Sequence, residues 1–231
     1  MDVKNNKIYL EVVRDLINAS KPKTILDVPS GNGRIKTLLN FSHHIDGIDL
    51  FETKPDGYRA FFKFDLDRGI PDYLGKYDAI ISCEGLEHLG NPLLFLSSIY
   101  NHLIDGGILI LTTPNIWYPE SKIKYLLRGF FPGFPSLIGK IDRGTHMHIT
   151  PWSYPQVYTY LTLAGLSNIF LHEDEEKKPK HIIERVIGFP QKLYLKKKVD
   201  SSKTDEEIGH WLTSASDQSI YGRRLIISAR K

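Results

Sequence analysis

The sequence has one cysteine, short apolar runs and little net charge, and each of these absences excludes a class of protein. Cys83 alone can form neither an internal disulfide nor a cysteine-based zinc site. Apolar runs such as residues 108–111 are far shorter than the roughly 20 residues of a membrane-spanning helix. The polar and charged residues 1–7 do not resemble a secretion signal. We therefore expect a soluble, cytoplasmic protein.

The formal charge of +3 on 231 residues does not indicate a nucleic-acid binder. No basic stripe with interleaved aromatic residues is evident, so no nucleic-acid partner is expected. The length suits one large α/β domain. We predict a single domain over residues 1–231, with insertions at about 115–148 and 174–218.

Short strands alternate with helices along most of the chain. Strands are expected over 24–28, 44–49, 60–64, 77–82, 108–112, 167–172 and 225–229, and helices over 9–17, 34–39, 92–103 and 150–165. Thr150 is the expected cap of the last helix, with Pro151 as its first residue. Segment 181–218 resists assignment. This alternation favours a mostly parallel sheet that is covered on both faces.

A glycine turn between the first strand and the following helix carries the functional argument. Gly31, Asn32 and Gly33 lie in this turn, where a ligand can approach the backbone closely. Asp49 ends the next strand, where a carboxylate can accept hydrogen bonds from both hydroxyls of a ribose. Lys36 stands where nicotinamide dehydrogenases have a third glycine, which disfavours that class.

These motifs, taken in order, resemble those of the class I S-adenosylmethionine-dependent methyltransferases, of the broad type found in ubiquinone biosynthesis. The first motif is matched by Leu26, Asp27, Gly31 and Gly33, and the acid after the second strand by Asp49. The segment 77–92, with Leu-Glu-His at 86–88, and the segment 103–115 are similar to the fourth and fifth strands of that family.

The resemblance implies a Rossmann-like doubly wound fold with helices on both faces and an antiparallel C-terminal strand. It also implies S-adenosyl-L-methionine as the cofactor. The residues expected to bind the cofactor are Asp27, Gly31, Asn32, Gly33, Asp49, Leu50, Asp65, Leu66, Cys83 and Glu84. Pro29 departs from the family pattern, because it replaces the usual first glycine and removes a backbone donor.

Methyl transfer from a sulfonium depends largely on positioning, and a base helps mainly when the acceptor is a hydroxyl. His88, His146 and His148 are the candidate catalytic residues. His88 follows the fourth strand, and the other two precede the helix that borders the acceptor pocket in similar enzymes. Structural hydrogen bonding is the alternative role for each. No third ligand accompanies His146 and His148, so no metal is expected.

The sequence says less about the acceptor than about the cofactor. Asn115, Trp117 and Tyr118 follow the fifth strand, where they either line an acceptor pocket or cover the core. The apolar segment 126–141 suits a lid, a dimer contact or a membrane contact. Lys196, Lys197 and Lys198 either assist at an anionic surface or form a solvated face.

We expect a methyltransferase that acts on oxygen or nitrogen of a small-molecule, saccharide or lipid-linked acceptor. A peripheral membrane contact and a homodimer remain open. The alternatives are a non-catalytic nucleoside-binding module of the same fold and a nicotinamide-dependent oxidoreductase.

Overall fold

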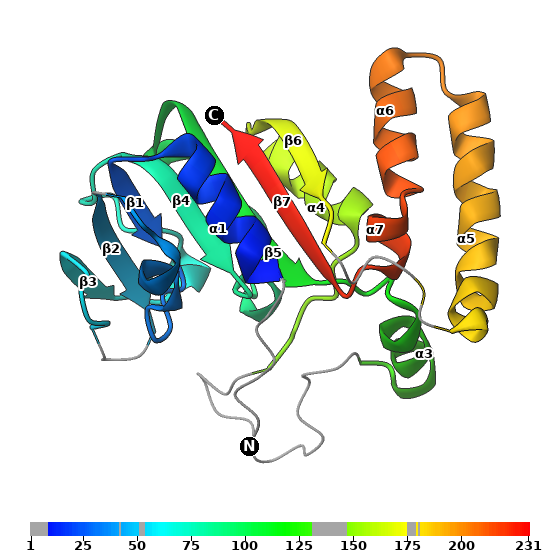
Figure 1. Cartoon of the computed structure of the whole chain (residues 1–231), viewed down its shortest axis with the longest axis horizontal. Coiled ribbons are helices and arrows are strands. Elements are labelled where there is room, and N and C mark those ends of the chain that lie inside the picture. Colours follow the sequence, from blue (N-terminus) through cyan, green and yellow to red (C-terminus); the bar gives the residue numbers. More distant parts are fainter. Residues whose placement is uncertain (1–8, 42, 51–53, 131–146, 175–178, 180) are drawn as a thin grey trace.

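The computed structural model describes residues 9–41, 43–50, 54–130, 147–174, 179 and 181–231. Its strands form one seven-stranded sheet in the order β3-β2-β1-β4-β5-β7-β6 (Figure 1). The strands are β1 (Thr24–Asp27), β2 (His44–Asp49), β3 (Ala60–Lys63), β4 (Tyr77–Cys83), β5 (Leu103–Pro114), β6 (Ser167–His172) and β7 (Arg224–Arg230).

The first five strands pair in parallel, and β7 inserts antiparallel between β5 and β6. The expected Rossmann-like sheet with an antiparallel C-terminal strand is therefore confirmed. Strand order reverses between β1 and β4, and this switch point is where open α/β sheets bind ligands, beyond the carboxyl ends of the strands.

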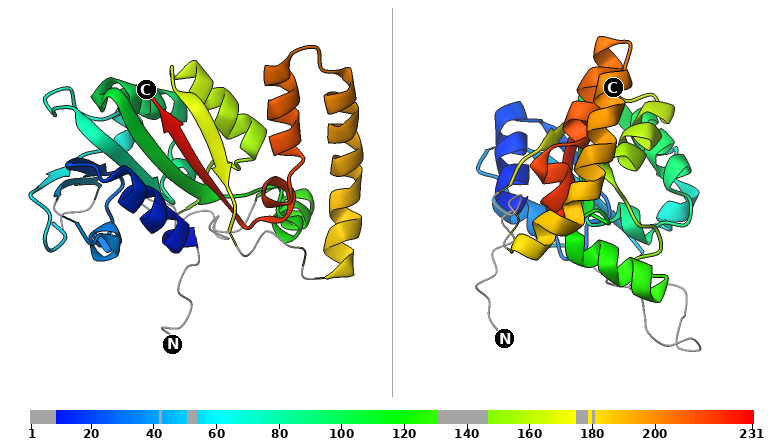
Figure 2. Two further views of the ribbon diagram at one scale, coloured as in Figure 1. Left: turned by 45° about the horizontal axis from the view of Figure 1, so that its top comes forward. Right: turned by 90° about the vertical axis from the view of Figure 1, so that its right-hand side faces the viewer.

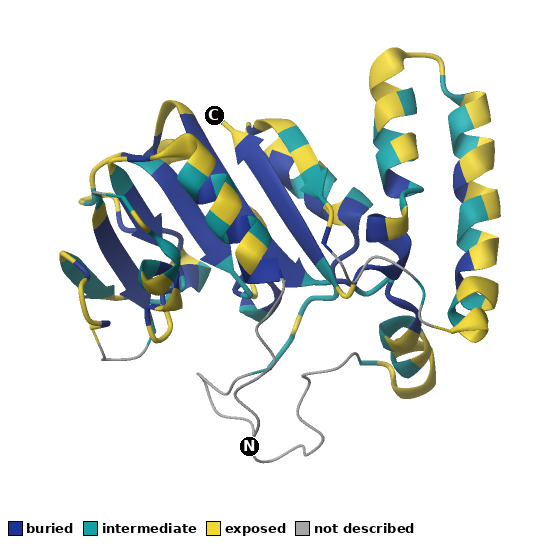
Figure 3. Cartoon of the chain, viewed as in Figure 1, coloured by how far each residue is buried: buried dark blue, intermediate teal, exposed yellow. Residues whose placement is uncertain are grey.

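Helices cover both faces of the sheet, so its central strands are buried on both sides (Figures 1 and 3). Helix α1 (Tyr9–Ser20) packs Val13 and Ile17 into one core layer. Helices α2 (Pro92–His102) and α4 (Tyr154–Leu163) pack Phe95, Leu96 and Val157 into the layer on the opposite face.

Segment 181–218, which resisted assignment, contributes to three helices beside the sheet, the last of which ends at Tyr221 (Figure 2). These are α5 (Ile182–Ser201), α6 (Asp205–Ser214) and α7 (Asp217–Tyr221). Helix α3 (Pro119–Arg128) follows β5 and contacts α5. No helix among the described residues combines the length and the apolar character needed to cross a membrane.

One local prediction was wrong, and another is confirmed as a 3₁₀ helix. Helix α4 begins at Tyr154 and not at Pro151, because Ser153 and Gln156 form a capping box and Trp152 forms a bridge with Asn115. The expected helix over 34–39 is a 3₁₀ helix over Arg34–Leu38. Its hydrogen bonds span three residues, which is the pattern of a 3₁₀ helix. The chain then continues into β2 at His44.

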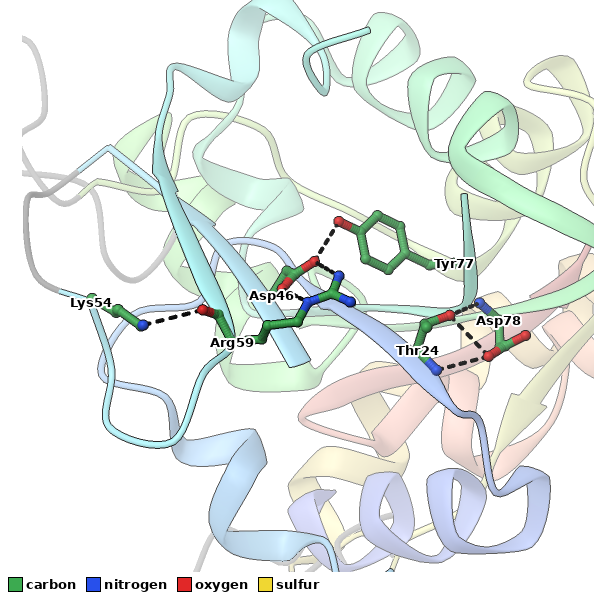
Figure 4. A network of polar contacts seen from close by, with 6 residues as sticks. All are labelled: Thr24, Asp46, Lys54, Arg59, Tyr77 and Asp78. Atoms are coloured by element: carbon green, nitrogen blue, oxygen red, sulfur yellow. Dashed lines mark hydrogen bonds and ion pairs between the residues drawn. The ribbon is translucent and has the colours of Figure 1, made fainter. Parts of the chain in front are cut away.

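A polar network ties three strands together at the sheet edge opposite to the carboxyl ends of the strands. Figure 4 shows Asp46 of β2, which is buried and accepts hydrogen bonds from Arg59 Nε at 2.9 Å and from Tyr77 Oη at 2.9 Å. Asp78 similarly accepts from the backbone N–H of Thr24 at 2.8 Å. Because a buried carboxylate without partners is costly, we assign this network to stability.

Candidate active site

A cavity of about 540 Å³ lies at the carboxyl ends of β1, β2, β3 and β4. Nine of the ten residues expected to bind the cofactor line it: Asp27, Gly31, Asn32, Asp49, Leu50, Asp65, Leu66, Cys83 and Glu84. These residues come from four separate strand ends. The parallel sheet therefore brings together positions that are up to 57 residues apart in sequence, from Asp27 to Glu84.

Asp49 is buried and lies directly beside the glycine turn. Its Oδ2 accepts a hydrogen bond from the backbone N–H of Gly31 at 2.8 Å. This bond fixes the turn after β1 against the end of β2, and it orients the Asp49 carboxylate at the wall of the cavity. The glycine turn and Asp49, which were the two strongest signals in the sequence, thus form one structural unit.

The glycine turn leaves room for a ligand against its backbone. Gly31 has φ +49°, and a Cβ added there would meet no atom within 4 Å. The neighbouring Ser30 lines the cavity, and its buried Oγ has no hydrogen-bond partner among the described residues. A buried hydroxyl without a partner is uncommon, and it fits a site that a polar ligand completes.

Gly33, the tenth expected residue, is not among the residues that line the cavity. It has φ +76°, and a Cβ there would lie 2.3 Å from Pro55 Cβ. A left-handed backbone and close packing on Pro55 therefore explain this glycine.

Pro29, which departs from the family pattern, packs closely against Gly85. The Pro29 ring lines the cavity, and a Cβ on Gly85 would lie 2.2 Å from Pro29 Cδ. The backbone donors on either side of Pro29 are used within the fold: Val28 N–H bonds to Ile81 O and Ser30 N–H bonds to Ile48 O. Pro29 therefore closes the turn by packing against the end of β4.

The cavity wall is rich in carboxyl groups. Its acidic residues are Asp27, Asp49, Asp65, Asp67 and Glu84, against one arginine, Arg34. Such a wall attracts a cationic ligand, and S-adenosylmethionine carries a sulfonium and an ammonium group. The same wall repels the pyrophosphate of a nicotinamide dinucleotide. This electrostatic pattern disfavours the oxidoreductase alternative independently of Lys36.

Burial raises the pKa of two groups in this wall, Asp27 and Cys83. It raises the pKa of Asp27 well above its ordinary value, and the charge of Asp49 adds to this effect, while the hydroxyl of Tyr58 donates to the carboxyl and opposes it. Burial also raises the pKa of the Cys83 thiol, followed by the effect of Asp27. Cys83 therefore stays protonated, and thiolate chemistry is not available to it.

Glu84 has a backbone conformation that is uncommon for a residue with a side chain, with φ +53°. Two contacts hold its carboxylate: Arg224 Nε donates to Oε2 at 3.0 Å and Thr112 Oγ1 donates to Oε1 at 3.2 Å. The Arg224 guanidinium also lies 4.5 Å from the ring centroid of Tyr9, which lines the cavity. Strand β7 therefore supports this end of the site.

His88 lines the cavity and contacts a buried acid. Its Nδ1 lies 2.6 Å from the carbonyl of Met147, which can only accept, so Nδ1 carries a hydrogen. Its Nε2 is turned away from solvent and lies 3.8 Å from Glu87 Oε1. The ring of His148 packs edge-on against that of His88, with centroids 4.9 Å apart, and His148 Nε2 lies 4.0 Å from the same oxygen.

Glu87 is fully buried at the centre of this group. Its Oε2 accepts from Thr113 Oγ1 at 3.0 Å, and its backbone carbonyl accepts from Ile149 N–H at 2.7 Å. Burial and then the charge of Glu84 raise the pKa of Glu87 to about 8. Glu87 thus fastens the segment 147–149 to the end of β4.

Glu87, His88 and His148 each place one possible ligand atom within 4.8 Å of the others. The sequence paired His146 with His148 as possible ligands, but the structure instead groups His148 with Glu87 and His88, and His146 lies outside the described residues. A metal ion would bind there only through a deprotonated Glu87 and neutral histidines.

The remaining candidates for contact with the acceptor either do not line the cavity, unlike His88, or lie outside the described residues. His146 lies outside the described residues, and His148 does not line the cavity. Asn115 donates to the carbonyls of Ser219 and Gly222 at 2.8 Å each, and Trp117 packs against the apolar cluster of the C-terminal helices. Asn115, Trp117 and Tyr118 are absent from the cavity wall, so covering the core explains them better.

The structure adds site residues that sequence patterns did not identify. Tyr9 was expected only as the first residue of the helix over 9–17, and Arg224 is 140 residues from Glu84. Leu10, Arg34 and Met147 also line the cavity. Only the spacing of Arg34, directly after the glycine turn, offered a local signal.

Comparison with known proteins agrees with this geometry. A family model described as "Methyltransferase domain" matches residues 5–170, which include every strand end that forms the cavity. The ubiquinone biosynthesis O-methyltransferase of Rickettsia canadensis is 26% identical over 177 residues, covering 70% of this chain and 71% of that protein. The protein of the same name from Maricaulis maris is 27% identical over 184 residues, covering 71% and 70%.

A solved structure shares the fold along the whole chain. It is the Burkholderia thailandensis 1,6-didemethyltoxoflavin-N1-methyltransferase, with bound 1,6-didemethyltoxoflavin and S-adenosylhomocysteine. Its TM-score is 0.55 at 14% identity, covering 100% of this chain and 81% of that one. Fold, cavity and family match therefore lead to one conclusion: the chain belongs to the methyltransferase-domain family and is a class I S-adenosylmethionine-dependent methyltransferase.

Proposed function

We propose that the enzyme methylates a hydroxyl oxygen of a small acceptor with an apolar body, which binds at the His88 end of the cavity. The observation that carries this proposal is the position of His88, a cavity-lining residue that also reaches the buried Glu87. A hydroxyl is the acceptor that gains most from a base. Leu89, Met147 and Ile149 line the same end and supply an apolar surface.

The curated relatives support oxygen as the methylated atom, since both are named O-methyltransferases. The Burkholderia enzyme is named an N1-methyltransferase, and it shares only the fold. Amine acceptors therefore belong in any test of this proposal. A saccharide or lipid-linked hydroxyl satisfies it equally, provided that the apolar end of the cavity accepts the part next to the hydroxyl.

The residues of the cavity fit the cofactor. In our assignment, Asp49 and Leu50 hold the ribose, Asp65 and Leu66 hold the adenine, and the turn at Ser30–Asn32 holds the amino-acid part. Asp27, Cys83 and Glu84 line the side of the cavity where we would place the sulfonium. The cofactor supplies an electrophilic methyl group with a neutral leaving group, so the chain's main task is alignment of the acceptor oxygen.

In this proposal His88 accepts the proton of the acceptor hydroxyl at Nε2. The Nδ1–H bond to Met147 leaves Nε2 as the basic nitrogen of a neutral ring. Because Nε2 is now turned toward Glu87, entry of the acceptor has to open this contact. Catalytic hydrogen bonds often align only when the substrate binds. Glu87 and His148 are positioning residues for His88.

The insertion at about 115–148 is proposed as an acceptor lid within a single domain over residues 1–231. Its end supports this role, since Met147 lines the cavity and the adjoining Ile149 is anchored to Glu87. Residues 131–146, including most of the apolar segment 126–141, lie outside the described residues.

The proposal is tested with methyl-labelled S-adenosylmethionine and a panel of alkyl-substituted phenols, catechols and matched anilines. We expect transfer to a hydroxyl, and we expect His88→Ala to lower kcat by about 10²–10⁴-fold with little change in cofactor affinity. Transfer to the anilines alone would contradict the assignment to oxygen.

The pH profile and a chelator separate a base from a metal. If His88 is the base, log kcat/KM rises with pH to a plateau in the wild type, and His88→Ala abolishes this rise. Excess EDTA should leave the rate unchanged. A rate that falls with EDTA and returns with Mg²⁺ or Zn²⁺ would show that Glu87, His88 and His148 hold a metal ion instead.

A further inference from the structure

Helix α5 carries apolar side chains on the side that points away from the rest of the chain. Ile182, Val186, Phe189 and Leu193 recur every three or four residues, and they are 82%, 65%, 58% and 48% exposed. At this spacing they lie on one side of the helix. We call this row the outer face of α5. Ile183 and Tyr194, also exposed, lie beside the row.

The opposite side of α5 provides its packing. Leu195 is buried in a cluster with Ile220 and Tyr221, and a Cβ on Gly188 would lie 2.6 Å from Tyr221. Figures 1 and 3 show α5 as the outermost helix, with exposed positions along its length. The helix is therefore held by its inner side, and the outer face plays no part in that packing.

Positively charged side chains lie on the same helix as this apolar row. Arg185, Lys196 and Lys197 are exposed, whereas Lys192 is paired with Asp217 at 2.7 Å. The acids of the helix are Glu184 and Asp200, and only Asp200, at the C-terminal end, is exposed. A surface that combines exposed apolar side chains with unbalanced positive charge is complementary to an apolar layer with an anionic boundary.

We propose that the outer face of α5 docks the enzyme on an anionic lipid bilayer, with the helix lying in the plane of the headgroups. Its outermost place on the molecule suits a flat surface, as both views in Figure 2 show. A second copy of the chain fits less well. Parallel pairing of two α5 helices brings like charges together, and antiparallel pairing buries Lys196 and Lys197 beside the other copy's apolar row.

Such docking is peripheral and independent of the acceptor's identity. Its strength depends on both buried apolar area and attraction to anionic headgroups. Both contributions can be tested separately, because the apolar side chains and the exposed lysines occupy different positions on α5.

The experiment is co-sedimentation of the full chain with vesicles of phosphatidylcholine, with and without 30–40% phosphatidylglycerol (roughly the anionic content that gives a strong surface potential). We expect binding to the anionic vesicles, weak binding to the neutral ones, and release by added salt because salt screens exposed charges. Phe189→Ser with Leu193→Ser should lower the partition coefficient by about tenfold or more. Lys196→Glu with Lys197→Glu should lower it similarly.

Matched controls change the same residue types elsewhere on the surface. Leu163→Ser with Leu212→Ser removes two apolar side chains that are 66% and 55% exposed on α4 and α6. Lys23→Glu with Lys76→Glu reverses two exposed charges far from α5 in sequence. Both controls should sediment like the wild type. Each variant must also keep its circular dichroism and its affinity for S-adenosylhomocysteine, which shows that the fold and the cavity are intact.

Several outcomes would overturn the proposal. These are absence of binding to anionic vesicles, equal loss in the controls, or binding that the α5 variants leave unchanged. Light scattering provides the remaining check. If the wild type is a dimer and Phe189→Ser with Leu193→Ser makes it monomeric, the outer face joins two copies of the chain and does not bind lipid.

Discussion

At the scale of single residues, Asp49 connects sequence and site most clearly. Its place at the end of the second strand was identified from the sequence, and the structure adds its bond to Gly31 N–H at 2.8 Å. One carboxylate therefore fixes the turn and faces the cavity. Both roles depend on the same side chain.

We expect Asp49→Ala to weaken S-adenosylhomocysteine binding by about 1–3 kcal/mol, since charge-assisted hydrogen bonds to the ribose are lost. Isothermal titration calorimetry measures this change. Asp72→Ala removes an exposed acid outside the cavity wall and serves as the control. Equal affinities for wild type and Asp49→Ala would contradict the ribose assignment.

Glu87 gives a prediction about pH. Burial raises its pKa in the folded protein to about 8, above the ordinary value of 4.5. A group with a raised folded pKa contributes stability that is fully present below about pH 4.5 and is lost as pH rises through 8. Glu87→Gln mimics the protonated carboxyl.

The melting temperature of the wild type should therefore fall more between pH 5 and pH 9 than that of Glu87→Gln, as followed by circular dichroism. Glu206→Gln, at an exposed position on α6, is the matched control and should behave like the wild type. Parallel curves for wild type and Glu87→Gln would show that Glu87 is ionised throughout this range.

At the scale of helices and strands, the sequence predicted elements well where hydrophobic periodicity was strong. All seven strands were anticipated. The central strands read as short apolar runs bounded by turns, which is the pattern of strands buried on both faces of a sheet. The start of α4 was misplaced because Thr150-Pro151 and Ser153-x-x-Gln156 are competing start signals. A long-range bridge between Asn115 and Trp152, invisible in the local sequence, accompanies the later start.

The helices of segment 181–218 escaped prediction for a different reason. Helix α5 exposes apolar residues on its outer face and contains Pro190, so it lacks the usual apolar-inside pattern. Likewise the local sequence around Leu86-Glu87-His88 does not indicate that Glu87 is buried. Its burial depends on residues 147–149, which are some 60 positions away.

The Asp46 network gives a test at this scale. Asp46→Ala removes the acceptor shared by Arg59 of the loop before β3 and Tyr77 of β4, and we expect a loss of about 1–3 kcal/mol in unfolding free energy. Denaturant unfolding measures it. Asp105→Ala removes a side chain that is 96% exposed and should change stability little. Similar stabilities for the two variants would show that the network does not support the sheet.

At the scale of the whole molecule, the sheet's switch point sets the place of the cavity, and the strand ends set its charge. The acidic groups at this edge, of which Glu84 is already paired with Arg224, disfavour the pyrophosphate of a dinucleotide. A ligand that binds only the native state also stabilises it.

S-adenosylhomocysteine at about 100 times its Kd should therefore raise the unfolding free energy by about 2.7 kcal/mol, and NADH at the same concentration should not. Thermal unfolding with each ligand measures the difference. Stabilisation by NADH alone would favour the oxidoreductase alternative.

The most direct test is a crystal structure of the enzyme with S-adenosylhomocysteine. We predict that both ribose hydroxyls lie within hydrogen-bond distance of the Asp49 carboxylate, that the amino-acid part lies along the turn at Ser30–Asn32, and that the sulfur faces the His88 end of the cavity. A nucleoside bound away from Asp49 and the glycine turn would contradict the assignment of this cavity as the cofactor site.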